Sequence, residues 1–171
     1  MVILLGLSLS MDAFSLAIIY GINKLSKRKE ILLSTIVGIY HFIMPIIGSK
    51  VGNIIFNYLP VDPNIIVSIL FIIIGIEMFL SKEEEAKPID NIFGMLLFGL
   101  AVSIDSLVSG IGLKYITNHI LLSALFISLT SFILTYIGLS FGKKIGFKLG
   151  KISNIVGGIV LVLLGIIYLF K

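Results

Sequence analysis

Two aspartates, Asp12 and Asp105, lie in the middle of long apolar segments of the chain. Each stands in a similar phrase: residues 10–14 read Ser-Met-Asp-Ala-Phe, and residues 103–107 read Ser-Ile-Asp-Ser-Leu. A carboxylate at the centre of a bilayer costs about 2.5–3.5 kcal/mol on insertion scales. Because the chain bears this cost at two matched places, we expect both groups to serve chemistry. Two carboxylates balance one divalent cation, so the pair indicates a cation pathway.

Hydroxyl side chains share the helix face of each aspartate. Ser8 and Ser15 lie four and three residues from the first aspartate, and Ser109 lies four residues from the second. At these spacings the side chains line one stripe of a helix, where a hydroxyl can donate to a carboxylate or orient a water molecule. For a single buried aspartate the alternatives are a hydrogen bond that joins two helices and a carboxyl group kept protonated by desolvation.

A second polar face is predicted from two other apolar segments. Pro45 cannot donate a backbone hydrogen bond, which frees the carbonyl of His41 four residues earlier. The imidazole of His41 is either a metal ligand or proton acceptor, or a partner in an interhelical hydrogen bond. Ser131 and Thr135 can add neutral oxygens. Such hard oxygen ligands suit Mg²⁺, Ca²⁺ or Mn²⁺, and an imidazole favours a transition metal.

The composition is that of an integral membrane protein. The chain is 58% hydrophobic and only 13% charged, with a mean hydropathy of +1.17, whereas soluble domains carry about 25% charged residues. The net charge of +4 comes from short clusters, so no nucleic-acid partner is expected. Cysteine is absent, which excludes thiolate ligands and disulfides. Because no P-loop or soluble domain is recognisable, transport is expected to use a gradient or a partner protein.

The predicted fold is all-α, with six transmembrane helices. A helix needs about 20 apolar residues to span a bilayer. The first apolar run has no basic residue before it and contains Asp12, so it is interpreted as a retained span and not as a signal peptide. The six spans are expected at roughly 2–22, 31–57, 63–80, 92–114, 119–141 and 152–170.

The basic residues predict the orientation. Ten of the 13 Lys and Arg residues fall in the first, third and fifth connections, which the positive-inside rule places in the cytoplasm. Both termini are therefore expected outside. The ten are Lys24, Lys27, Arg28, Lys29, Lys82, Lys87, Lys143, Lys144, Lys148 and Lys151; the other three are Lys50, Lys114 and Lys171.

The two halves of the chain resemble each other. A shift of 93 residues superposes Gly6 and Asp12 on Gly99 and Asp105, and shifts of 94 and 90 superpose Gly48 on Gly142 and Gly75 on Gly165. Each half holds three spans, so the second half enters the membrane upside down. This is an inverted repeat, with a site expected near the midplane between the halves. The predicted units are a first three-helix repeat (1–81), a cytoplasmic linker (82–91) and a second repeat (92–171).

A third carboxylate, Glu77, is predicted near the cytoplasmic end of the third span. Lys82 follows it by five residues, and an interfacial ion pair is the expected role. The run Glu83-Glu84-Glu85 is interpreted as a solvated loop.

These residues resemble a known family. The two aspartate phrases, the Met-Pro-Ile-Ile-Gly segment (44–48) and the closing Gly-Gly-Ile-Val-Leu (157–161) are similar to the bacterial manganese efflux pumps (MntP-type), which are grouped with LysE-like exporters. The similarity runs from about residue 3 to residue 170. One departure is that some members carry a carboxylate where this chain has His41.

The resemblance implies a secondary transporter, not an enzyme. It implies Mn²⁺ export from the cytoplasm across the bacterial plasma membrane, a role in manganese homeostasis, with Asp12 and Asp105 as the functional carboxylates. Mn²⁺ is then the transported substrate, and no cofactor is expected. The partners are a divalent metal ion and the lipid bilayer, while the oligomeric state stays open.

Two other functions are compatible with part of this pattern. An intramembrane aspartyl protease also uses two membrane-embedded aspartates, but it characteristically has Gly-x-Gly-Asp where this chain has Val-Ser-Ile-Asp (102–105). A structural or sporulation-type membrane protein of the same fold, with no transported substrate, is the non-catalytic alternative. Exchange of either aspartate for asparagine leaves such a scaffold working but stops a transporter.

Overall fold

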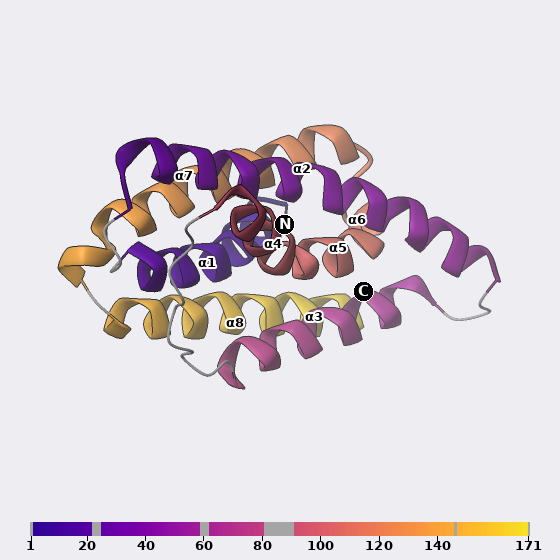
Figure 1. Cartoon of the computed structure of the whole chain (residues 1–171). Helices are drawn as coiled ribbons and strands as arrows, with labels where there is room; N and C mark the ends of the chain where they lie inside the picture. The colour runs from indigo at the N-terminus through magenta and orange to yellow at the C-terminus, as the bar shows by residue number, and fades with distance from the viewer. Residues whose placement is uncertain (1, 22–24, 59–61, 81–90, 146, 171) are drawn as a thin grey trace.

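The computed structural model describes residues 2–21, 25–58, 62–80, 91–145 and 147–170 of the 171 residues. All regular structure in these ranges is α-helical, which confirms the predicted fold class (Figure 1). The helices are α1 (Val2–Gly21), α2 (Lys27–Tyr58), α3 (Pro63–Leu80), α4 (Ile92–Val102), α5 (Ile104–Ile111), α6 (Leu113–Ile116), α7 (Ile120–Ile145) and α8 (Phe147–Leu169).

Six helical segments of the described residues are long and apolar enough to cross a membrane, as predicted. The fourth, Ile92–Ile111, is made of α4 and α5 together. Large aliphatic and aromatic side chains are exposed on the outward faces, for example Ile3, Ile54 and Phe93, each more than 60% exposed. So much exposed apolar surface is a liability in water. In a bilayer it is the expected lipid-facing surface.

The helices pack closely because small residues lie at their crossings. α1 packs against α7 and α8, whereas α2 packs against α7 and α5. A methyl group on Gly48 of α2 would collide with the carbonyl oxygen of Leu107 in α5. Likewise, one on Gly142 of α7 would collide with the carbonyl oxygen of Ile18 in α1. Such contacts between backbones are typical of helix packing in lipid, where no hydrophobic effect drives association.

α3 and α8 form an antiparallel pair with reciprocal contacts. A methyl group on Gly75 would lie 2.8 Å from the Gly158 carbonyl oxygen, and one on Gly165 would lie 2.9 Å from the Ser68 carbonyl oxygen. Subtracting 90 from Gly165 and Gly158 gives 75 and 68, so each contact repeats the other with the two helices exchanged.

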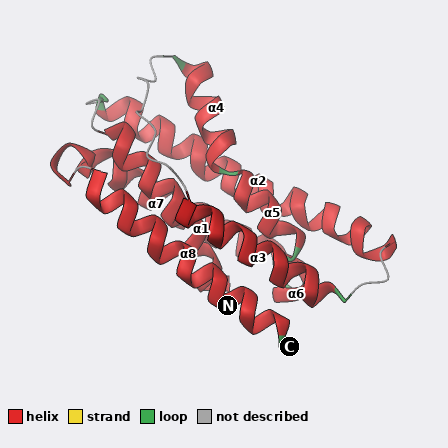
Figure 2. Ribbon diagram, turned by 90° about the horizontal axis from the view of Figure 1, so that it is seen from below, coloured by secondary structure: helices red, strands yellow, loops and turns green. Residues whose placement is uncertain are grey.

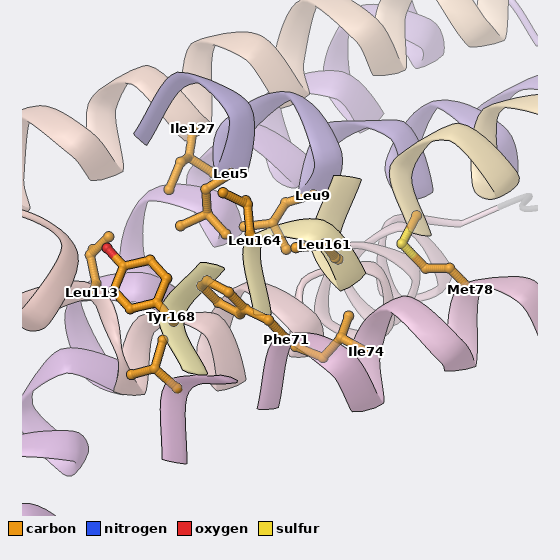
Figure 3. Close-up of a cluster of buried hydrophobic side chains, with 11 residues drawn as sticks. Leu5, Leu9, Phe71, Ile74, Met78, Leu113, Ile127, Leu161, Leu164 and Tyr168 are labelled. Atoms are coloured by element: carbon orange, nitrogen blue, oxygen red, sulfur yellow. The ribbon is translucent and has the colours of Figure 1, made fainter. Parts of the chain in front are cut away.

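An apolar core fills the space between α1, α3, α7 and α8 (Figure 3). The rings of Phe71 and Tyr168 meet edge to face with their centroids 6.1 Å apart. Leu5, Leu9 and Leu161 pack around them and are fully buried. Ile74 and Met78 continue the cluster along α3.

The fourth span is broken at Ser103. Its backbone leaves the helical conformation, with φ of −105° and ψ of 5°, and its hydroxyl donates to the Gly99 carbonyl at 2.8 Å. Figure 2 shows α4 running at an angle to its neighbours. A second break at Gly112 separates α5 from α6. The single helix expected over 92–114 is therefore corrected to three shorter helices. At the first break the Ser103 backbone N–H donates to the Leu100 carbonyl, and the Ser103 hydroxyl takes its place as the donor to the Gly99 carbonyl.

Pro45, in contrast, lies inside α2 without ending it. It is buried and packs against Gly110, where a methyl group would lie 2.6 Å from the Pro45 carbonyl oxygen. The backbone of α5 therefore approaches that of α2 closely at Pro45.

Candidate metal site

A cavity of about 210 Å³ lies where α1, α3 and the broken fourth span meet. Both Asp12 and Asp105 line it, although they are separated by 93 residues in the sequence. The full lining is Asp12, Ile74, Glu77, Met78, Ala101, Val102, Ile104, Asp105 and Val108. Three carboxylates thus share one small chamber whose other walls are mainly apolar.

The apolar core holds the walls of this chamber. Ile74 and Met78 belong to the buried cluster between α3 and α8, and they flank Glu77 on one face of α3 at helical spacing. Val102 belongs to a second buried cluster, which also contains Ala13, the residue after Asp12. Both sides of the cavity are therefore anchored by packed side chains.

The break at Ser103 gives Asp105 a distinct environment. Asp105 lies in the first turn of α5, where backbone N–H groups have no partner within the helix. Its Oδ1 atom accepts a hydrogen bond from the Ser106 amide at 2.6 Å. Its Oδ2 atom is buried and has no hydrogen-bond partner among the described residues. One oxygen thus fixes the side chain while the other keeps its full capacity to bind a cation.

Glu77 is the cavity residue that the sequence analysis missed. The ion pair expected between Glu77 and Lys82 involves a residue outside the described ranges, while Glu77 itself lines the same chamber as the two aspartates and has an exposed side chain. All three carboxylates interact electrostatically with one another. The sequence signal for Glu77 was its spacing from Ile74. The two residues are three apart and share a face of α3, so a buried Ile74 turns Glu77 toward the same neighbours, although Glu77 lies only three residues before the end of the helix.

The predicted supporting hydroxyls on the aspartate helices lie outside the cavity lining. Ser8, Ser15 and Ser109 are all buried. Ser8 donates to the Leu4 carbonyl at 2.8 Å and lines a separate cavity of about 170 Å³ between α1 and α8. No charged side chain lines that second cavity. The three carboxylates thus line the first cavity and not the cavity between α1 and α8.

The second predicted polar face also lies apart from the chamber. The Nδ1 atom of His41 is 3.0 Å from the Val37 carbonyl, so this nitrogen must carry the hydrogen, and the buried Nε2 atom has no partner among the described residues. Ser131 shares a hydrogen bond with Ser10, and the hydroxyl of Thr135 is buried. With Pro45, these residues stabilise or line the helix interfaces and do not contact the cavity.

The described residues contain no group of three or more His, Cys, Asp or Glu side chains that converges on one metal position. The three cavity carboxylates therefore share a chamber without forming a closed coordination shell. At about 30 Å³ per water molecule, the chamber has room for several waters. The arrangement suits a cation that keeps part of its hydration shell.

Known proteins similar to this chain agree on one family. A family model described as "Putative manganese efflux pump" matches residues 24–169. The chain is 32% identical over 170 residues to a Bacillus pumilus protein, covering 98% of this chain and 92% of that one. It is 35% identical over 176 residues to a Clostridium botulinum protein, covering 98% and 96%. The two relatives are named "Putative manganese efflux pump MntP" and "Putative manganese efflux pump MntP 1".

The chain belongs to the manganese efflux pump family. An Aliarcobacter butzleri member is 34% identical over 172 residues, covering 96% of each chain. The family is one of membrane transporters and not of enzymes, and its named metal is a substrate and not a cofactor. The resemblance drawn from the aspartate phrases is confirmed, and the protease alternative is not supported. No solved structure matches the chain.

Proposed function

We propose that this protein exports a divalent metal cation, Mn²⁺, from the cytoplasm through the cavity at Asp12 and Asp105. The observation that carries the proposal is the chamber itself, in which two aspartates from distant parts of the sequence line one small volume. Two carboxylates neutralise one divalent charge, and oxygen ligands with retained water suit Mn²⁺. The family's name and the relatives' names support manganese over other divalent metals.

The same proposal includes an inverted repeat. The reciprocal contacts of Gly75 and Gly165 across the antiparallel α3–α8 pair support a two-fold axis perpendicular to these helices. An axis of that direction lies in the plane of the membrane and relates two halves of opposite orientation. The charged chamber lies between α3 and the fourth span, while an uncharged cavity lies at the corresponding α1–α8 junction. This inequality is expected of a transporter that opens to one side at a time.

Metal transport can be tested directly in cells that lack their own manganese exporter. Expression of this chain should lower the accumulated Mn²⁺ and restore growth at high external manganese. Parallel measurements with Fe²⁺, Co²⁺, Zn²⁺, Mg²⁺ and Ca²⁺ define the selectivity. Unchanged content of all six metals, with the protein present in the membrane, contradicts export.

The proposed orientation places both termini outside the bacterial plasma membrane. The chain is free of cysteine, so single cysteines report on sidedness without background. Cysteine at the exposed Asn118 should react with an impermeant thiol reagent in intact cells, whereas cysteine at the exposed Ser26 should react only after lysis. The reverse pattern contradicts the orientation.

A further inference from the structure

We propose that Glu77 is the entry ligand of the transport site, a carboxylate at the mouth of the cavity that binds the hydrated cation before Asp12 and Asp105 do. This inference rests on the proposed function, and it assigns a separate step to a residue with no counterpart in the repeat. At a shift of 90, the position equivalent to Glu77 is Ile167.

Burial sets Glu77 apart from the two aspartates of the chamber. Glu77 is exposed, whereas Asp12 and Asp105 are half-buried. Glu77 lies three residues from the end of α3, about 4.5 Å at 1.5 Å per residue, and Asp12 lies nine residues from the end of α1, about 13 Å. Both helix ends precede connections that the basic residues assign to the cytoplasm. Glu77 is therefore the first of the three that an ion from the cytoplasm meets.

The charge count separates the role of Glu77 from that of the aspartates. Asp12 and Asp105 already balance a divalent cation, so a third carboxylate leaves the loaded chamber with excess negative charge. Such excess charge in a low-dielectric cleft raises the local concentration of cations and their rate of entry. The absence of a converging ligand cluster among the described residues fits successive binding better than simultaneous binding by all three groups.

The deeper end of the chamber offers an acceptor for the ion to move to. The Oδ2 atom of Asp105 is buried and has no hydrogen-bond partner among the described residues, although Oδ1 is held by the Ser106 amide. An unpartnered buried carboxylate oxygen gains more from a cation than an exposed one does, because water compensates it less. This difference favours movement of the ion from Glu77 to Asp105.

The test is the concentration dependence of Mn²⁺ uptake into inside-out membrane vesicles, which present the cytoplasmic face to the medium. Glu77→Gln should raise the half-saturating Mn²⁺ concentration about five- to ten-fold and leave the maximal rate within about two-fold. Glu77→Asp keeps the charge and should stay near the parent protein. Glu84→Gln is the matched control, because it removes one carboxylate from the following connection and should change neither parameter.

Each alternative result is informative. An unchanged half-saturating concentration in Glu77→Gln overturns the entry role. So does an equal effect of Glu84→Gln, which indicates diffuse surface charge. Loss of the maximal rate in Glu77→Gln, with the same amount of folded protein, puts Glu77 in the central site instead. If Glu77→Gln fails to fold, Mn²⁺ uptake by the parent protein is measured at several ionic strengths. A half-saturating concentration that does not change with ionic strength overturns the proposal. Normal transport by both Asp12→Asn and Asp105→Asn contradicts the proposed function itself.

Discussion

Ser10 of α1 and Ser131 of α7 share a buried hydrogen bond of 2.9 Å, two residues before Asp12. Ser10 also donates to the Gly6 carbonyl within its own helix at 2.6 Å, so Ser131 is the donor in the bond between the helices. The pair joins a helix of the first half to a helix of the second. It therefore sets the register in which α1 carries Asp12 into the cavity.

A double-mutant cycle measures this link. Ser10→Ala and Ser131→Ala should each destabilise the protein in detergent, and the double mutant should lose less than the sum. The expected coupling is about 0.6 kcal/mol, an average for hydrogen bonds between membrane helices. Thr130→Ala is the control, because the Thr130 hydroxyl donates only to the Phe126 carbonyl of its own helix. Strictly additive losses at positions 10 and 131 exclude the coupling.

The two aspartates should fail together. Asp12→Asn or Asp105→Asn should each abolish Mn²⁺ export, because the remaining carboxylate cannot balance a divalent charge. The double mutant should be little worse than either single one. Asp62→Asn is the control, since Asp62 is exposed and caps α3 by accepting a 2.9 Å hydrogen bond from the backbone N–H of Asn64. Efflux assays with immunoblots of the membrane fraction separate lost transport from lost protein, and full export by both single mutants rules out this site.

Backbone contacts make some glycines irreplaceable. Gly48→Ala should lower stability by about 1–3 kcal/mol, the usual cost of overpacking, because the new methyl group meets the Leu107 carbonyl. Gly38→Ala should cost less, since its nearest neighbour, the Phe132 Cβ atom, lies 3.2 Å away. Thermal unfolding in detergent compares the two. If the two variants have equal melting temperatures, the methyl group at position 48 costs no more than the one at position 38. The predicted collision with the Leu107 carbonyl is then contradicted.

His41→Gln distinguishes the two roles that the sequence left open. His41 does not line the cavity, and its ring is hydrogen-bonded to the Val37 carbonyl. The variant should therefore keep the half-saturating Mn²⁺ concentration within about two-fold. Its main effect should be a loss of stability below about 3 kcal/mol, the range for changing one buried hydrogen bond. A large rise in the half-saturating concentration, with smaller preference for Mn²⁺ over Mg²⁺, instead identifies the imidazole as a ligand.

The six helices were predictable because length and hydropathy alone decide what can span a bilayer. The position of the helix break was not. Pro45 is the residue that local rules select as a breaker, yet α2 continues through it, while the fourth span breaks at Ser103. Serine is compatible with a membrane helix, and only its tertiary surroundings decide whether its hydroxyl replaces a backbone bond.

The candidate site, like the fold, was predictable only in part. Asp12 and Asp105 were recognisable because a carboxylate is costly in an apolar run. Glu77 was not, since its place near a helix end made an interfacial role equally reasonable, and the face it presents depends on how α3 packs against α8. The hydroxyls of Ser8 and Ser15 share the helix stripe of Asp12 but do not line the cavity, because a shared stripe does not ensure a shared cavity.

The depth of the two aspartates has a consequence for energetics. An inside-negative membrane opposes the exit of a cation by about 2.3 kcal/mol per charge per 100 mV, so a divalent ion meets about 4.6 kcal/mol. The two aspartates together with that ion carry no net charge, so voltage acts little on the loaded pair. It acts instead on the empty aspartate pair, whose two negative charges must return toward the negative side of the membrane. If two protons occupy the aspartates during the return, the whole cycle moves no net charge, and export becomes independent of the membrane potential.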